Sequence, residues 1–176
     1  MSSAVDLIRN AIRDVPDFPK PGIMFKDIAP LLENAEAMRA TIDLFVEHWS
    51  GREITHVAGL ESRGFPFGGA LADRLGVGFV MLRKPGKLPY EKHGVDYDLE
   101  YGTDRIEVHV DSVGPNDRVL LVDDLLATGG TAAAGAKLLR DRCGTTVVGC
   151  AFVVELSFLN GGQKLGDIPY KALVSY

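Results

Sequence analysis

Two adjacent carboxylates, Asp123 and Asp124, stand where a run of apolar residues ends. After three more residues comes a Thr-Gly-Gly-Thr turn at 128–131. Carboxylate oxygens suit vicinal hydroxyls or a divalent cation, and their charge repels phosphate. The turn suits phosphate, because its glycines let backbone N–H groups approach an anion and its threonines add hydroxyl donors. Hydroxyls on one side and phosphate on the other point to a ribose phosphate.

The segments on either side of these groups indicate how they are positioned. The apolar run at 118–122 predicts a buried strand with the carboxylates at its tip, and 132–142 predicts a long helix after the turn. In open α/β sheets, ligands bind outside the carboxyl ends of the strands. The positive end of the helix dipole at this edge favours a negative group.

Other phosphate-binding patterns fit less well. A Walker A loop is excluded, because GxxxxGK[ST] is absent, and no GxGxxG opens a helix after a strand. A phospho-receiver domain also places carboxylates at strand ends around magnesium, but it needs no TGGT turn. A generic phosphate loop stays open from this stretch alone.

Length and composition favour one soluble globular domain over residues 1–176. The chain has 176 residues, 46% of them hydrophobic and 24% charged. A net charge of −5 argues against a partner such as nucleic acid or a membrane surface. Cys143 and Cys150 fit reduced thiols rather than a disulfide framework. The chain opens without an apolar signal region, and no apolar run approaches about 18 residues. We therefore expect a cytoplasmic protein.

Strands alternate with helices along the chain. We predict further helices over 3–13, 34–50 and 67–75, and further strands over 54–60, 77–82, 105–110, 145–156 and 171–175. This alternation predicts an α/β fold with a mainly parallel sheet flanked by helices. The proline-rich stretch 16–22 predicts an irregular loop, and the basic stretch from 83 to about 93 a mobile one. Residues 1 to about 34 are expected to form a small cap.

Four segments resemble the type I phosphoribosyltransferases. VLLVDDLLATGGT at 119–131 is similar to that family's motif for 5-phosphoribosyl 1-diphosphate (PRPP). The others are DFPKPGIMFKDIAPLL at 17–32, AGLESRGFPFGGALA at 58–72, and RKPGKLP with DLEYG between 83 and 102. Together they span nearly the whole chain, and in this order they resemble the members that act on adenine.

The resemblance implies both a fold and a reaction. The fold is type I phosphoribosyltransferase-like, with a small N-terminal hood and a flexible loop. The reaction is the transfer of the 5-phosphoribosyl group from PRPP to adenine, giving AMP and diphosphate in purine salvage, with Mg²⁺ as cofactor. A homodimer is also implied, and the apolar helix with Phe65, Phe67 and Leu71 is a candidate interface.

The resemblance also assigns the residues that hold PRPP. Asp123 and Asp124 would hold the ribose hydroxyls, directly or through magnesium. The residues for the 5-phosphate are Ala127, Thr128, Gly129, Gly130 and Thr131. The residues for diphosphate are Glu61, Ser62, Arg63, Arg83, Lys84 and Lys87. Arg63 would clamp this leaving group as a catalytic residue; the family often has aspartate where this chain has Glu61.

The resemblance assigns other segments to the purine base. Glu100 matches the family's proposed acid/base for the purine ring, and its neighbour Tyr101 could desolvate it. Phe25 would stack on adenine, while backbone groups of Met24 and Lys26 read its edge and Leu156 closes the other face. Some relatives have arginine where this chain has Lys26.

Three competing functions remain open from the residues. One is transfer to xanthine, hypoxanthine or guanine, which the FKDI and DLEYG contexts disfavour. Another is a regulator that senses PRPP without turnover, although such a protein is expected to carry a basic nucleic-acid-binding face. The third is a phosphatase or receiver-like magnesium protein.

Overall fold

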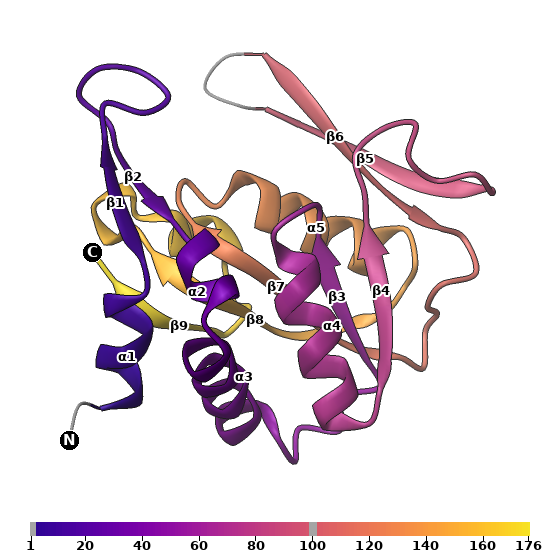
Figure 1. Cartoon of the computed structure of the whole chain (residues 1–176). Coiled ribbons are helices and arrows are strands. Elements are labelled where there is room, and N and C mark those ends of the chain that lie inside the picture. The colour runs from indigo at the N-terminus through magenta and orange to yellow at the C-terminus, as the bar shows by residue number, and fades with distance from the viewer. Residues whose placement is uncertain (1–2, 99–101) are drawn as a thin grey trace.

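A five-stranded parallel sheet forms the centre of the computed structural model, which describes residues 3–98 and 102–176 (Figure 1). Its strand order is β4-β3-β7-β8-β9, and all neighbouring pairs are parallel. The strands are β3 (His56–Leu60), β4 (Gly78–Leu82), β7 (Arg118–Leu126), β8 (Thr146–Glu155) and β9 (Tyr170–Ser175). Continuous apolar runs suit strands that are covered on both faces. The predicted parallel sheet is confirmed.

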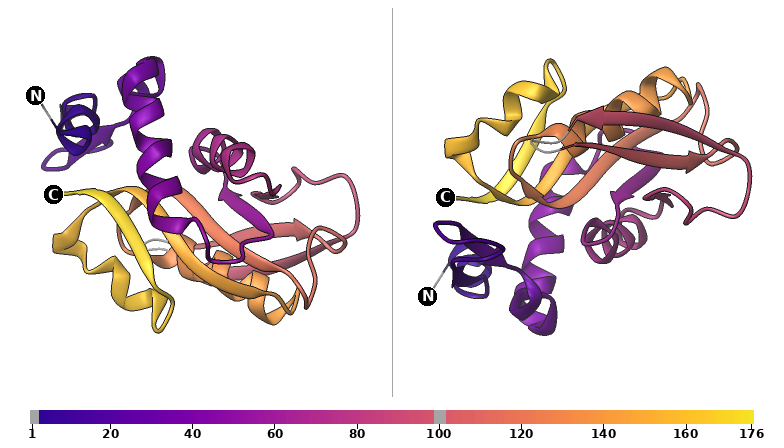
Figure 2. Two further views of the ribbon diagram at one scale, coloured as in Figure 1. Left: turned by 90° about the horizontal axis from the view of Figure 1, so that it is seen from below. Right: turned by 90° about the horizontal axis from the view of Figure 1, so that it is seen from above.

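Helices cover both faces of this sheet (Figure 2). One face carries α1 (Ala4–Asn10), α2 (Ala29–Glu33), α3 (Ala35–Trp49) and α4 (Gly64–Leu75). The other carries α5 (Gly130–Asp141) and the antiparallel hairpin β5 (Lys92–Asp98) and β6 (Thr103–His109). Leu120 and Val122 join the first core and Val119 and Leu121 the second, as alternation along a strand requires. Within the described residues, no helix is long and apolar enough to span a membrane.

Helix starts follow capping chemistry that the sequence shows. The Ser3 hydroxyl accepts the Asp6 N–H at 3.1 Å, and the Asp6 carboxylate accepts the Ser3 N–H at 3.0 Å. The Asn34 side chain accepts two N–H groups at the start of α3. Helix α1 ends at Asn10 rather than 13, because the chain turns there into an extended strand.

The proline-rich stretch is more regular than predicted. Strands β1 (Arg13–Pro16) and β2 (Met24–Asp27) pair into an antiparallel hairpin, called here the hood hairpin, and only the turn between them is irregular. Pro16 ends an edge strand, where its missing N–H costs no ladder bond. The Asp17 carboxylate accepts the Gly22 N–H at 2.8 Å and closes the turn.

The predicted mobile loop ends earlier than expected, since β5 begins at Lys92. This strand was not predicted, because few of its residues are apolar and Gly94 interrupts it. A Cβ at Gly94 would lie 2.3 Å from Arg105 Nη2 on the paired strand, so a side chain there would displace the end of that arginine.

The suggested dimer contact on α4 needs correction. Phe67 and Leu71 are fully buried in the core beneath α4, so they are not available to a partner. Phe65 is half-buried and packs edge-to-face against Phe79.

Asp117 fixes the start of two central strands. Its carboxylate accepts the Gly114 N–H at 2.8 Å and the Thr55 hydroxyl at 3.0 Å, just before β7 and β3. The Gly114 hydrogen bond is the main cause that lowers the pKa of Asp117. Stability from such a group is present above the unfolded-state pKa, about 3.9, and is lost as pH falls through the lower folded-state pKa.

We therefore expect Asp117→Asn to cost about 1 kcal/mol at pH 7, or about 2–4 °C in Tm. The difference from the parent chain should shrink as pH falls below about 4, because the parent then loses the same charge. Urea unfolding at pH 7, 5 and 3 measures this, with the exposed Asp111→Asn as the matched control. A difference that stays constant with pH would contradict the assignment.

Candidate active site

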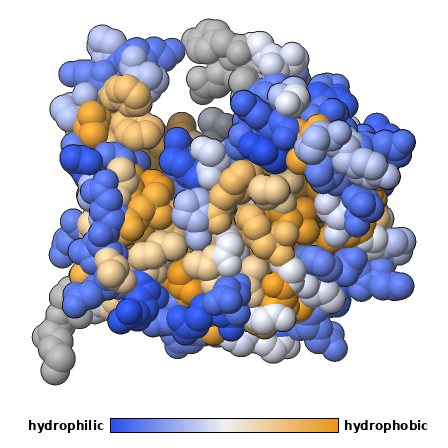
Figure 3. Space-filling view, turned by 45° about the vertical axis from the view of Figure 1, so that its right-hand side comes forward, coloured by the Kyte–Doolittle hydropathy of each residue, from blue (hydrophilic) through white to orange (hydrophobic). Residues whose placement is uncertain are grey.

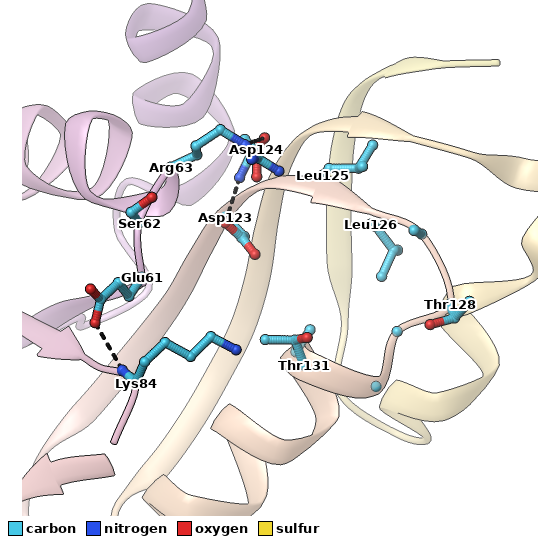
Figure 4. A pocket seen from close by; sticks show the side chains of 14 residues that line it. Glu61, Ser62, Arg63, Lys84, Asp123, Asp124, Leu125, Leu126, Thr128 and Thr131 are labelled. Carbon is cyan, nitrogen blue, oxygen red and sulfur yellow. Dashed lines mark hydrogen bonds and ion pairs between the residues drawn. The ribbon is translucent and has the colours of Figure 1, made fainter. Parts of the chain in front are cut away.

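The sheet order places a ligand crevice between β3 and β7. From β3 the chain runs outward to β4, and later it returns to β7 on the other side of β3. At such a reversal, the loops after the two strands diverge and leave a crevice at the carboxyl ends. Residues 61–63 directly follow β3, and they line a cavity of about 310 Å³ together with Lys84 and residues 123–132 (Figure 4).

The two aspartates lie inside β7, not at its tip as predicted. Pairing with β8 continues to Leu126, opposite Glu155, whereas pairing with β3 ends at Val122. The strand continues because β8 is long enough to support it on one side. Beyond Val122 the other edge of β7 is free and borders the crevice. The carboxylates therefore stand on rigid backbone beside the cavity.

Asp123 and Asp124 bring two carboxylates close together, and Arg63 compensates part of their negative charge. Asp124 Oδ2 lies 2.6 Å from Arg63 Nε, and the Asp124 side chain is only 6% exposed. Asp123 is half-buried, and its Oδ1 accepts the Asp124 N–H at 2.9 Å. Burial, reinforced by the neighbouring carboxylate, raises the pKa of Asp123 well above its usual range. A ligand that offers hydroxyl donors or a cation would relieve this crowding.

A glycine lets Arg63 reach this pair. A Cβ on Gly64 would lie 2.6 Å from the Val122 carbonyl oxygen, so the first turn of α4 packs directly on β7. Arg63 precedes that turn, lines the cavity, and has 53% of its side chain exposed. The peptide bond between Glu61 and Ser62 is cis.

Glu61 faces away from any anion in the cavity. Its carboxylate accepts Arg83 Nε at 3.2 Å, Arg83 Nη2 at 3.3 Å and the Lys84 N–H at 2.8 Å. Burial alone would raise the pKa of Glu61, but these hydrogen bonds lower it. The Glu61 side chain is therefore an anchor for the segment after β4.

Lys84 crosses the cavity and joins three elements (Figure 4). Its ammonium pairs with Asp104 of β6 and lies 2.9 Å from the Tyr97 hydroxyl of β5. The Thr131 hydroxyl of α5 donates to the same Tyr97 oxygen at 3.4 Å. The Lys84 ammonium and the Tyr97 hydroxyl thus link the β5–β6 hairpin, the end of β4 and the start of α5.

The glycine-rich turn has its predicted shape and a neighbour that was not predicted. Gly129 has φ +78°, a left-handed conformation that glycine adopts at little cost. A Cβ on Gly129 would lie 2.2 Å from the Gly161 oxygen, and one on Gly161 would lie 2.1 Å from the Ala127 oxygen. Gly161 opens the 3₁₀ helix η2 (Gly161–Leu165), which follows η1 (Ser157–Leu159). Only a close backbone contact reveals this role, since no motif surrounds Gly161.

A second cavity, of about 1120 Å³, adjoins the turn and reaches the hood hairpin. It shares Thr128, Gly130 and Thr131 with the first cavity. Of the residues predicted for the base, Met24, Lys26 and Leu156 line it. Phe25 does not, because it alternates to the other face of β2 and packs against Phe18 with ring centroids 5.0 Å apart.

Lys26 is held at the wall of this second cavity. Its ammonium lies 2.6 Å from Asp14 Oδ1 and 3.7 Å above the Tyr176 ring. Only 10% of its side chain is exposed. The side chain is thus fixed between the hood hairpin and the end of the sheet.

Comparison with known proteins identifies this arrangement of strands and turn. A family model described as the phosphoribosyl transferase domain matches residues 28–173. The chain belongs to this family. An adenine phosphoribosyltransferase of Synechocystis sp. is 55% identical to it over 171 residues, which cover 96% of this chain and 99% of the relative.

Solved structures agree with this phosphoribosyltransferase over nearly its whole length. The adenine phosphoribosyltransferase of Thermoanaerobacter pseudethanolicus has a TM-score of 0.94 at 48% identity and covers 98% of this chain and 99% of its own. The enzyme of Saccharomyces cerevisiae, complexed with an imino-altritol bisphosphate and adenine, has a TM-score of 0.92 at 39% identity and covers 98% and 99%. The type I phosphoribosyltransferase fold is confirmed.

The phosphoribosyltransferase brings most of the predicted residues to the two cavities. The first cavity gathers those from both strand ends: Glu61, Ser62, Arg63, Lys84, Asp123, Asp124 and 127–131. Arg83 and Lys87 do not line it; the Arg83 guanidinium donates to Glu61 and to the Lys87 carbonyl oxygen at 3.2 Å. Glu100 lies outside the described residues.

The described residues that suit magnesium in this phosphoribosyltransferase are the two aspartates beside the first cavity. Among the described residues, no three His, Cys, Asp or Glu side chains gather closely enough to hold a metal. Asp123 and Asp124 are two carboxylates beside a cavity, and Mg²⁺ is commonly held by one or two carboxylates plus substrate oxygens. The donor set therefore suits an ion that arrives with PRPP.

Proposed function

We propose that the protein is an adenine phosphoribosyltransferase, which transfers the 5-phosphoribosyl group of PRPP to adenine and releases AMP and diphosphate. The observation that carries this function is the pair of aspartates on the free edge of β7, with the phosphate turn on one side and Arg63 on the other. The adjoining second cavity leaves room for a base. Relatives about 54% identical over nearly the full chain carry the same activity in their names.

We assign each group of PRPP to the residues of the first cavity whose chemistry suits it. The 5-phosphate occupies the turn 127–131 at the start of α5, where backbone N–H groups and the threonine hydroxyls are its donors. The ribose hydroxyls donate to Asp123 and Asp124. The diphosphate then extends toward Ser62, Arg63 and Lys84, which line the same cavity. Mg²⁺ bound with PRPP would offset the charge of the leaving group.

The chemical step needs a C–O bond at the anomeric carbon to break while adenine attacks. The sugar becomes cation-like, and the carboxylates of Asp123 and Asp124 lie where they stabilise that charge. Arg63 neutralises charge that develops on the departing diphosphate. To do so it exchanges part of its contact with Asp124, which its exposed guanidinium allows. Positioning by β7 and α4 supplies the remaining rate enhancement.

Adenine binds in the second cavity under the hood hairpin. Strand β2 pairs only with β1 among the described residues, so its other edge offers free backbone groups. Backbone of Met24 and Lys26 reads the exocyclic amine and ring nitrogens, and Leu156 packs on the ring. Phe25 reaches the base only if the hood hairpin rotates, because its ring now packs on Phe18.

The segment after β4 closes over the diphosphate. Arg83, Lys84 and Lys87 carry three positive charges next to the first cavity, and Lys84 already lines it. Closure would exclude water and limit hydrolysis of PRPP.

Glu100 supplies or accepts the proton of the purine ring in this proposal, which rests on the resemblance of DLEYG. We expect Glu100→Gln to lower kcat far more than affinity for PRPP, because the amide keeps the shape of the side chain but transfers no proton. Steady-state rates and equilibrium binding of PRPP separate the two effects. Unchanged turnover would remove Glu100 from the mechanism.

We also propose a homodimer in the cytoplasm. Apolar side chains gather across the middle of one face of the molecule (Figure 3). Met81 on the edge strand β4 is 45% exposed, next to the half-buried Phe79. Both cysteines are free and buried, as in a reducing compartment. A monomer mass that does not change with concentration would refute the dimer.

The reaction is tested by mixing the purified protein with PRPP, magnesium and each of adenine, hypoxanthine, guanine and xanthine. Mass spectrometry of the products should show AMP from adenine and no nucleotide from the other bases. A different nucleotide would overturn the assigned base site and keep the fold. PRPP binding without any nucleotide would support a regulator, and phosphate release without a base would support a phosphatase.

A further inference from the structure

Lys164 differs from the other cations that line the two cavities. Arg63, Lys84 and Lys26 also line them, and each lies within ion-pair distance of a carboxylate: Asp124, Asp104 and Asp14 respectively. Lys164 lines the second cavity and forms no ion pair with any described residue. Among the described residues, its ammonium therefore has no carboxylate within ion-pair distance.

The fold holds this ammonium at the phosphate turn. Lys164 Nζ lies 4.0 Å from where a Cβ would stand on Gly130, the first residue of α5. Helix η2 is fixed on both sides of Lys164, because Leu165 is 3% exposed in the core and Gly161 packs on the Ala127 and Gly129 backbone. The lysine thus extends from a short helix that is anchored against the turn itself.

The turn lacks a cation of its own. Its donors to phosphate are neutral: backbone N–H groups and the hydroxyls of Thr128 and Thr131. Arg63 and Lys84 come from the segments after β3 and β4, and each already pairs with a carboxylate, Asp124 and Asp104 respectively. Of the cations that line the two cavities, Lys164 is thus the one near the turn that has no carboxylate partner among the described residues.

We propose that Lys164 binds the 5-phosphate of PRPP and of AMP, and thereby separates phosphorylated ribosides from nucleosides. The proposal rests on the proposed function and adds a residue to its phosphate site. Ammonium–phosphate hydrogen bonds are charge-assisted, so they are stronger than those from neutral donors. Because the contact is to phosphate alone, its loss affects ligands that carry the 5-phosphate and leaves others unchanged.

The test compares ligands that differ only in this phosphate. Calorimetric titration of Lys164→Gln should show AMP bound about tenfold or more weakly than by the parent chain. Binding of adenosine should stay unchanged. Lys164→Arg should retain most of the AMP affinity, and KM for PRPP should rise more than kcat falls. Lys137→Gln, an exposed lysine of α5 that lines neither cavity, is the matched control.

Ribose 5-phosphate separates this proposal from the proposed function, since it needs no base site. Weaker ribose 5-phosphate binding by Lys164→Gln supports the role of Lys164 even if the parent chain makes no AMP. Equal weakening of AMP and adenosine would overturn it and leave a merely structural role. Unchanged AMP and ribose 5-phosphate binding would overturn it as well, whatever base the enzyme uses.

Discussion

Arg63→Ala lowers kcat/KM for PRPP by about 100- to 1000-fold, the loss expected when one preorganised donor to developing charge is removed. Two effects combine. The diphosphate loses a guanidinium at the crevice, and the Asp124 carboxylate, 6% exposed, loses the countercharge 2.6 Å away. Initial rates at varied PRPP concentrations measure the loss.

Two further variants separate these effects. Arg63→Lys keeps a positive charge for Asp124 but lacks the planar fork, so its rate should fall between the parent and Arg63→Ala. Arg39→Ala removes an exposed arginine of α3 and should leave the rate unchanged. A drop of less than about tenfold for Arg63→Ala, with thermal stability preserved, would remove Arg63 from the leaving-group site.

Gly161→Ala should abolish most AMP binding although no side chain of the site is changed. The added Cβ would lie 2.1 Å from the Ala127 oxygen and 3.0 Å from the Gly129 N, and all of these are backbone atoms. Either the turn or η2 must move, which misaligns the N–H groups that receive phosphate. We expect AMP to bind about 100-fold more weakly, because several hydrogen bonds to a charged group are disturbed together.

The contrast with another glycine makes this a test of geometry. Gly114→Ala adds the same methyl where no atom lies within 4 Å and φ is not positive, so affinity should stay unchanged. Circular dichroism and thermal unfolding establish that Gly161→Ala retains the sheet. Undiminished AMP affinity in a folded Gly161→Ala protein would show that phosphate binds elsewhere.

The central sheet was predictable because its strands are continuous apolar runs. Thr145 to Leu156 predicted β8, which the structure has at Thr146–Glu155. Strands with mixed composition were not predictable: β5 is rich in charge, and β1 contains a proline. The end of β7 was misplaced because charge at Asp123 suggested a turn, whereas pairing with β8 extends the strand. The end of β7 depends on its pairing with β8, a strand that lies later in the chain, so the residues near Asp123 alone do not predict it.

The candidate site divides in the same way. Contiguous motifs predicted the turn 128–131 and the aspartates, since all their groups follow one another along the chain. Contacts between distant segments were not predictable, such as Gly161 against Ala127 or Tyr97 against Lys84. The role of Phe25 was also not predictable, because the motif gives its place in the chain but not the face of β2 on which its ring lies.

The fluorescence of Trp49 should report unfolding but not ligand binding. It is the single tryptophan, fully buried where α3 meets β8, and a Cβ on Gly149 would lie 2.2 Å from its ring. It lines neither cavity. Its emission therefore follows the separation of α3 from the sheet on unfolding and stays unchanged when AMP or PRPP binds. Fluorescence can thus record the stability of each variant independently of its affinity.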